Sequence, residues 1–165
     1  MIRFVLVASL LIGCRTSLET AADASVGSNG RGCTDDLNSS VCVAAKTMNV
    51  SDLGWIQTNI FTPSCIFMGC HSSAADVGKL DLTSGKSHDA LVGATSQLET
   101  TRKLVVPMDV QASYLMLMLH DFDPKTASPP GTAPGIGYMP LGFGPLCCQK
   151  LDAVERWITA GAPAN

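Results

Sequence analysis

Cys65, Cys70 and His71 have the residue types and the order that covalent haem attachment requires. Two thiols can add across the vinyl groups of a porphyrin, and a histidine directly after the second thiol can bind the iron as its proximal ligand. The usual motif has two residues between the cysteines, whereas this sequence has four. The motif therefore predicts one haem c, held by two thioethers through a loop that is wider than usual.

Two other types of site use the same residues and stay open on the sequence alone. A disulfide between Cys65 and Cys70 would close a small loop beside an ordinary histidine, and the protein would then contain no haem. A zinc ion would need a fourth ligand besides Cys65, Cys70 and His71, for which Cys147 and Cys148 are the candidates. No other part of the sequence has the spacing of a zinc site.

Met139 is the expected distal ligand of the iron. A distal thioether has to reach the ring face opposite His71 from a loop, and Pro140 restricts Met139 to an extended conformation that can present its side chain. His71 and Met139 would then be the two metal ligands. An open sixth position is one alternative, and the other candidate ligands are Met68 in the attachment loop, Met108 after a proline, Met116 and Met118 in an expected helix, His88 and His120.

The first 13 residues are expected to be a lipoprotein signal peptide. Residues 1–3 carry a positive charge, and residues 4–12 form an apolar run that is too short to span a bilayer. The run ends in Leu-Ile-Gly-Cys at residues 11–14, which resembles a bacterial lipobox. Cys14 is therefore the expected lipidation site and membrane anchor. An ordinary signal peptide with an incidental cysteine is the alternative.

Arg15 bears on which membrane the anchor occupies. An aspartate after the lipidated cysteine is associated with retention in the inner membrane of enteric bacteria, and this chain has Arg15 at that position. The outer membrane is therefore favoured over the inner membrane. Export also places the chain in an oxidising compartment, where disulfides and thioethers persist.

Four further cysteines are candidates for disulfides. If the motif carries haem, then Cys33, Cys42, Cys147 and Cys148 remain and allow three pairings. Cysteines adjacent in sequence rarely bond to each other. We therefore expect Cys147, Cys148 or both to bond to the Cys33/Cys42 segment, and a local Cys33–Cys42 disulfide is the alternative.

The composition excludes several classes of function. The 165 residues include 11 Lys and Arg against 14 Asp and Glu, a net charge of −3, and no basic run is available to follow a phosphate backbone. We therefore expect no nucleic acid partner. The sequence also lacks a phosphate-binding glycine loop and a recognisable nucleophile motif, so an enzyme is not expected.

The chain divides into a tether and one domain. Residues 14–50 are expected to be a lipidated tether that includes the Cys33/Cys42 segment, because residues 16–32 are mostly small and polar and cannot bury enough surface to order themselves. The domain is expected over residues 51–165. It should be all-α, since no strand-like alternation occurs.

Four helices are expected in this domain. Residues 53–61 have apolar residues at helical spacing and should end before Pro63, which leads the chain into the motif. A short helix over residues 87–92 would begin at Ser87 as its cap and end at Gly93. Residues 110–120 predict a buried helix, whose Tyr114, Leu115 and Met118 either line a haem pocket or belong to the plain core.

The end of the chain completes this pattern. Residues 123–137 hold four prolines and three glycines without periodicity, which predicts a surface loop. An amphipathic helix should follow, with Leu151, Val154, Trp157 and Ile158 on its apolar face. Gly161 and Pro163 should end it.

Residues 53–163 resemble a class I cytochrome c fold. A helix enters a Cys…Cys-His motif, Met-Pro follows a long loop, and a helix closes the domain. More narrowly, the chain is similar to cytochrome c-like domains of secreted planctomycete and myxobacterial proteins in residues 78–82, 91–93, 105–107, 112–115, 139–142 and 153–163. The resemblance implies thioethers at Cys65 and Cys70, His71 as proximal ligand and Met139 as distal ligand. Met108 departs from it, because that family commonly has glycine there.

Two functions follow as expectations. The first is a membrane-anchored, extracytoplasmic electron-transfer protein with one haem c, whose redox partner the sequence does not name. The second is a haem-free cytochrome-like module, stapled by disulfides, with a structural or binding role at the cell surface. Seven methionines and a thioether-ligated iron favour the first.

Overall fold

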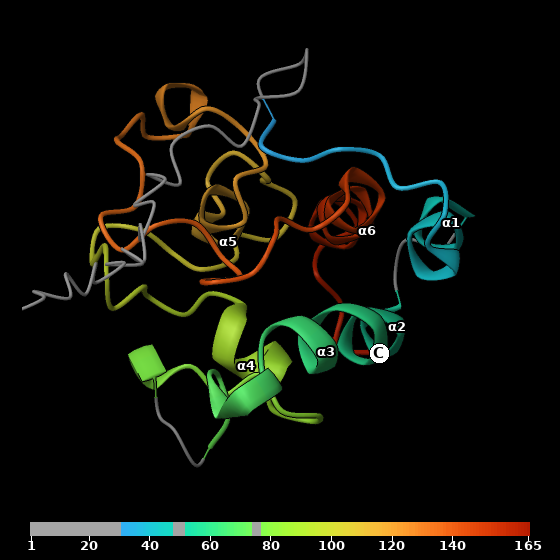
Figure 1. The fold of residues 1–165 in the computed structure, drawn as a ribbon. Helices are drawn as coiled ribbons and strands as arrows, with labels where there is room; N and C mark the ends of the chain where they lie inside the picture. The colour runs from blue at the N-terminus through green and yellow to red at the C-terminus, as the bar shows by residue number, and fades with distance from the viewer. Residues whose placement is uncertain (1–30, 48–51, 74–76) are drawn as a thin grey trace, which may run out of the picture.

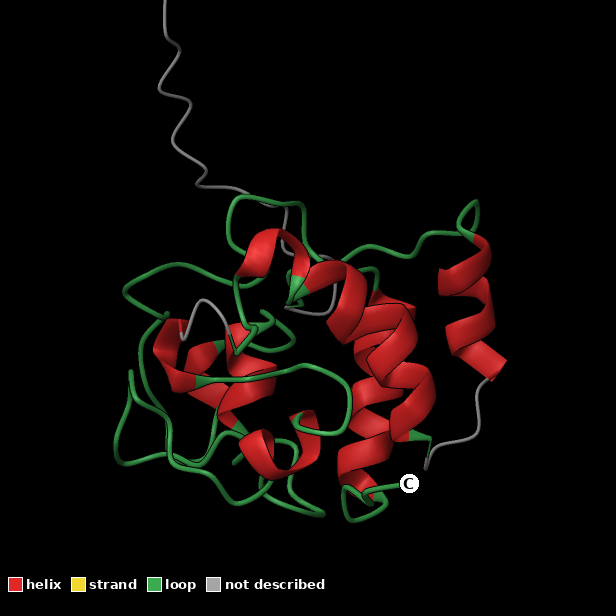
Figure 2. Cartoon of the chain, turned by 90° about the horizontal axis from the view of Figure 1, so that it is seen from below, coloured by secondary structure: helices red, strands yellow, loops and turns green. Residues whose placement is uncertain are grey.

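Helices joined by long loops make up residues 31–47, 52–73 and 77–165, which this computed structural model describes (Figures 1 and 2). These ranges contain no β-strand, only three isolated bridges, in agreement with the all-α expectation. No helix in them is long and apolar enough to cross a bilayer. The α-helices are α1 (Ser40–Thr47), α2 (Leu53–Ile56), α3 (Thr62–Ser64), α4 (Ser87–Leu91), α5 (Tyr114–Met118) and α6 (Cys148–Thr159). The π-helix η1 (Gln57–Phe61) and the 3₁₀ helices η2 (Phe67–Gly69), η3 (Val77–Lys79) and η4 (Pro124–Thr126) complete the elements.

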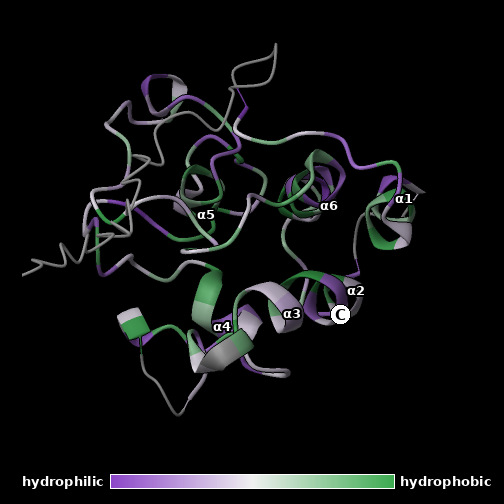
Figure 3. Ribbon diagram, viewed as in Figure 1, coloured by the Kyte–Doolittle hydropathy of each residue, from purple (hydrophilic) through white to green (hydrophobic). Residues whose placement is uncertain are grey.

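Helix α6 forms the centre of the apolar core, as its pattern predicted. Leu151, Val154, Trp157 and Ile158 are fully buried, whereas the residues between them are mostly half-exposed. This two-sided character explains the mixed colouring of α6 in Figure 3. The helix ends at Thr159, and Gly161 then turns the chain with a φ of 97°, a conformation that glycine adopts most readily.

The elements α2, η1 and α3 form one helical run that delivers the chain to Cys65. Asp52 caps its start, because its carboxylate accepts a hydrogen bond from the Trp55 N–H at 2.9 Å. The expected end before Pro63 is wrong by two residues, since Pro63 lies inside α3. A proline donates no backbone hydrogen bond, and the wide turn of η1 directly before α3 already loosens the helical ladder.

Helix α4 agrees with the expected position but not with the expected cap. Lys86 occupies the cap position, and the Ser87 hydroxyl instead donates to the buried side chain of Gln57 at 2.7 Å. That bond joins α4 to η1, and the same Gln57 side chain also donates to the Leu82 carbonyl at 2.9 Å. Gly93 follows the helix with a φ of 70°, as predicted.

Helix α5 is much shorter than the expected span of residues 110–120. It covers only Tyr114–Met118, and all five residues are buried. The Ser113 hydroxyl explains the late start, because it donates to the Asp109 carbonyl at 2.7 Å and accepts from the Val106 N–H at 2.9 Å. Such local bonds to the backbone compete with helix formation.

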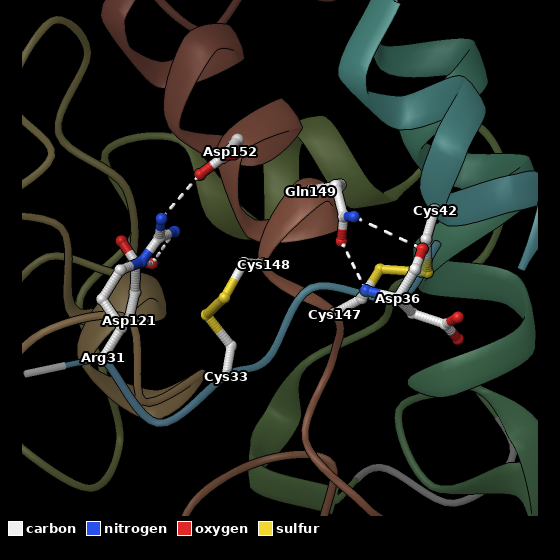
Figure 4. Close-up of a disulfide and its surroundings, with 9 residues drawn as sticks. All are labelled: Arg31, Cys33, Asp36, Cys42, Asp121, Cys147, Cys148, Gln149 and Asp152. Atoms are coloured by element: carbon white, nitrogen blue, oxygen red, sulfur yellow. Dashed lines mark hydrogen bonds and ion pairs between the residues drawn. A yellow bond between two sulfur atoms is a disulfide. The ribbon is translucent and has the colours of Figure 1, made fainter. Parts of the chain in front are cut away.

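The packed part of the chain extends further toward the N-terminus than the expected boundary at residue 51. Helix α1 lies beside α6 (Figure 1), and disulfides join Cys33 to Cys148 and Cys42 to Cys147 (Figure 4). Residues 31–47 therefore belong to the folded body. Both disulfides agree with the expected bonding of Cys147 and Cys148 to the Cys33/Cys42 segment, and they span 115 and 105 residues of sequence. The expected signal peptide and Cys14 lie outside the described residues.

Candidate functional site

An apolar cavity of about 160 Å³ lies between the motif loop, α5 and the loop that carries Met139. Its lining includes Cys65, His71 and Met139, so the structure brings together three of the four expected haem-binding residues. An engineered apolar cavity of roughly 150 Å³ stays dry and binds benzene, so the enclosed volume alone would hold a small aromatic group, and a porphyrin would require the wall to open. Eight aliphatic side chains contribute to the lining: Val77, Leu80, Leu82, Leu98, Leu104, Leu115, Leu119 and Ile136.

Two backbone hydrogen bonds hold His71 in position. Its N–H donates to the Cys65 carbonyl at 3.0 Å, and its own carbonyl accepts from the Leu82 N–H at 2.9 Å. The ring nitrogen Nδ1 lies 3.2 Å from the Val77 carbonyl oxygen. Since a carbonyl only accepts, Nδ1 carries the proton of this bond, and Nε2 of the neutral ring keeps a free lone pair. Metal-binding histidines commonly have this arrangement.

The two motif cysteines have different surroundings. Cys65 follows α3 and is half-buried, and burial raises the pKa of its thiol to about 12. Cys70 follows η2, is exposed and does not line the cavity. Both are free thiols in the structure, so the Cys65–Cys70 disulfide is not formed. The attachment site is thus only half assembled around the cavity, with Cys65 in place and Cys70 outside.

Met139 is half-buried in the cavity wall and tied to α5. Its backbone N–H donates to the Met118 carbonyl at 2.7 Å, which joins the Met139 loop to the end of the helix. Met118 is buried and also lines the cavity, so it is the one competing thioether at this site among the described side chains. Met108 is 75% exposed and Met116 is fully buried in the core, and neither lines the cavity.

Tyr114, Leu115 and Met118 contribute to the cavity wall, which was one of the two roles considered for them. The sequence analysis missed the loop of Ser96, Gln97 and Leu98, which closes another part of the wall. These three residues have no periodic pattern and belong to no helix, so only the folded chain brings them to the site. Arg102 lies outside this lining, with its guanidinium carbon 5.9 Å from the Tyr114 ring centroid.

The zinc alternative is wrong in its choice of ligands. Cys147 and Cys148 are both in disulfides, so neither thiolate is available to a metal. Within the described ranges, no three His, Cys, Asp or Glu side chains come together as a metal site.

The other two histidines lie away from the cavity. The His120 ring stacks on Tyr138 with centroids 3.7 Å apart, and burial lowers the pKa of this imidazole. His88 contacts the Ala162 carbonyl through Nε2 at 3.0 Å. Neither ring is part of the cavity wall, so His71 is the histidine of the candidate site.

Comparisons with known proteins add nothing to the cytochrome resemblance, which therefore depends on the sequence motifs described above. No family model matches the chain, and the searches of curated proteins and of solved structures found no match.

Proposed function

We propose that this protein transfers electrons outside the cytoplasm through one covalently attached haem c, with His71 and Met139 as iron ligands. The observation that supports this is the convergence of Cys65, His71 and Met139 on a single apolar cavity. The proposal includes the cytochrome c-like fold that the sequence resembles. When bound, the haem iron supplies a one-electron couple, and His/Met ligation closes it to substrates and raises its potential.

The residues of the chain have separate tasks in this proposal. The Nδ1–H bond of His71 to Val77 fixes the ring orientation and makes Nε2 a better donor to iron. The bond of Met139 to Met118 holds the loop that presents the thioether. The leucines of the wall exclude water from the iron, and low polarity around a haem is one of the factors that set its potential.

The thiols would be consumed in attachment. At each cysteine the S–H adds across a vinyl double bond, so that sulfur bonds one vinyl carbon and hydrogen the other. The high pKa of Cys65 keeps its sulfur protonated at neutral pH. Cys70 would have to reach the porphyrin from its exposed position. The thioether at Cys70 should therefore be harder to form than the one at Cys65.

The proposal includes a lipid anchor at Cys14 and a place in the oxidising cell envelope, with the outer membrane favoured. The two disulfides support an oxidising compartment. The electron-transfer partner would then be another redox protein of that compartment. Cys14→Ser should release the protein from the membrane fraction or leave it unprocessed. An unmodified mature terminus elsewhere, found by mass spectrometry, would remove the anchor.

The central test is a visible spectrum of protein made with a competent haem-ligation system. Soret absorption should stay with the protein after acid–acetone extraction. Cys65→Ser and Cys70→Ser should each lower the fraction that resists extraction, and the double variant should abolish it. Met108→Ala is the control, since that side chain is exposed and outside the cavity, and the variant should leave the haem attached.

A second candidate is the haem-free, disulfide-stapled module. The position of Cys70 outside the cavity favours it, as do the two disulfides that hold the fold without any ligand. A colourless protein with both disulfides intact, made beside a haem-loaded control cytochrome, would support the module and overturn the haem proposal.

A further inference from the structure

Residues 31–33, the first that the structure describes, are fixed at both ends (Figure 4). Arg31 donates to Asp121 through Nε at 2.8 Å and to Asp152 of α6 through Nη1 at 2.7 Å. The cysteine at the other end of this segment forms its disulfide with Cys148. Two charge-assisted contacts and one covalent bond therefore hold the segment against α6 and the chain beside it.

Gly32, in the middle of this segment, lies directly against the ring of His120. Its N–H donates to the His120 carbonyl at 2.8 Å, and a Cβ atom at residue 32 would overlap the imidazole atoms Nδ1, Cγ and Cε1. Only glycine allows the backbone to approach the ring this closely. A methyl group at residue 32 would force the imidazole to rotate or the segment to move away.

The same imidazole stacks on the ring of Tyr138. The two ring centroids are 3.7 Å apart and the ring planes differ by 6°. Tyr138 directly precedes Met139, whose N–H donates to the Met118 carbonyl at 2.7 Å. Residues 138 and 139 are therefore attached to residues 118–120 by two neighbouring contacts, one between rings and one between backbone groups.

This attachment lies just outside the apolar cavity. Neither His120 nor Tyr138 is among the residues that line the cavity, so neither is placed to bind iron there. Groups behind a metal ligand fix its orientation, and the ligand has to be held within roughly 0.5 Å of its productive position. The Met139 loop needs such support from outside, because residues 127–146 contain no helix.

We propose that the stack of His120 on Tyr138, supported by residues 31–33, positions Met139 as the distal iron ligand. This inference rests on the proposed function, because it concerns a ligand of the haem iron. It adds two positioning residues that the haem-attachment motif does not contain. It also gives His120 a role other than that of an iron ligand.

The test measures how firmly the thioether holds ferric iron in the haem-loaded full chain. Added imidazole replaces the Met139 sulfur on the iron, and an absorbance titration gives its affinity. His120→Asn removes the ring but keeps a residue type that tolerates the φ of 59° at this position. Imidazole should then bind about two- to tenfold more tightly, the factor that corresponds to the loss of one aromatic pair. His88→Asn is the matched control and should leave the affinity unchanged, since His88 is also half-buried and lies away from the cavity.

Further variants disturb the stack from its other sides. Tyr138→Leu should raise the imidazole affinity as His120→Asn does, whereas Tyr138→Phe keeps the ring and should restore the wild-type value. Gly32→Ala should raise the affinity too, although this residue is far from Met139 in sequence. Gly144→Ala is its control, because Gly144 lies in the Met139 loop but a Cβ atom there would meet no other atom within 4 Å.

A double-mutant cycle separates positioning of the ligand from a general loosening of the fold. In a Met139→Ala background there is no thioether to position, so His120→Asn should leave the imidazole affinity unchanged. An equal rise in both backgrounds, or no rise in the wild-type background, overturns the inference and leaves the proposed function standing. A wild-type protein that retains no haem after extraction overturns both.

Discussion

The region around α6 and the region around the apolar cavity are held together by different means. The first joins α1, α2 and α6 through two disulfides and a fully buried helix face. The second is built largely from loops, which are joined by isolated backbone bonds such as those from Gly93 to Val105 and from Tyr114 to Lys103. The first region is therefore cross-linked by covalent bonds of the chain itself. Under the haem proposal, the second region would depend more on the group bound in its cavity.

The largest expected effect comes from opening the cross-linked region. Replacing both Cys33 and Cys42 with serine removes two bonds that close long stretches of chain, and each should contribute about 2–5 kcal/mol to the free energy of unfolding. Urea unfolding of the haem-free protein measures the loss. Cys65→Ser with Cys70→Ser is the control, since both are free thiols. An equal loss in the control would contradict the division into two regions.

The next prediction concerns Met139, the expected iron ligand of the cavity region. Met139→Ala in the haem-loaded protein should abolish the weak near-infrared band of sulfur-to-ferric charge transfer and lower the reduction potential, while covalent haem persists. Met108→Ala is the control, because that side chain is 75% exposed and outside the cavity. If Met118→Ala removes the band and Met139→Ala does not, the buried neighbour is the ligand.

A smaller effect on the free energy of unfolding is expected from the titration of Glu155 in α6. Burial, and then the neighbouring carboxylate of Asp121, raise the pKa of Glu155 to about 8, while Arg31 opposes the shift. The folded protein therefore binds a proton that the unfolded chain has already released above about pH 4.5. The stability that this bound proton contributes is complete below about pH 4.5 and is lost as the pH rises through about 8.

Urea unfolding at about pH 5 and about pH 8 checks this sign. The wild type should lose stability between the two values, and Glu155→Gln should lose less because its side chain does not titrate. A variant with the same pH dependence as the wild type would mean that another group is responsible.

The smallest effect concerns the reactivity of the two motif thiols and should leave stability unchanged. With a pKa of about 12, roughly one Cys65 in ten thousand is a thiolate at about pH 8, so alkylation should be slow. Exposed Cys70 should react first in the haem-free protein. Mass spectrometry over time resolves the order of labelling. Faster labelling of Cys65 would mean that the motif loop opens readily.

The two regions also differed in how far the sequence could predict them. Helix α6 was predicted with its buried face and its glycine stop, because its period and its end signals agree. The span of α5 was overestimated, since the bonds of Ser113 to backbone groups depend on a turn that no pattern announces. The disulfides from Cys147 and Cys148 to the Cys33/Cys42 segment were expected from the sequence, whereas the packing of α1 against α6 that accompanies them was not.

The candidate site was predictable where chemistry dictates residue types. Cys65, His71 and Met139 follow from the motif and from the position of Pro140, and they do line one cavity. The outward position of Cys70 was not predictable, because it depends on how the four intervening residues turn through η2. The part of the wall formed by Ser96, Gln97 and Leu98 was not predictable either, since these residues belong to no periodic element.

The positions of the paired cysteines also set an order of events in biosynthesis. Under the proposed export, Cys33 and Cys42 would leave the membrane pore 115 and 105 residues before their partners Cys148 and Cys147. Neither disulfide could form until those partners had followed. During that interval Cys65 and Cys70 would already be outside and accessible to a ligation enzyme. Under that proposal, delayed cross-linking would leave a time window in which the motif is modified before the fold closes.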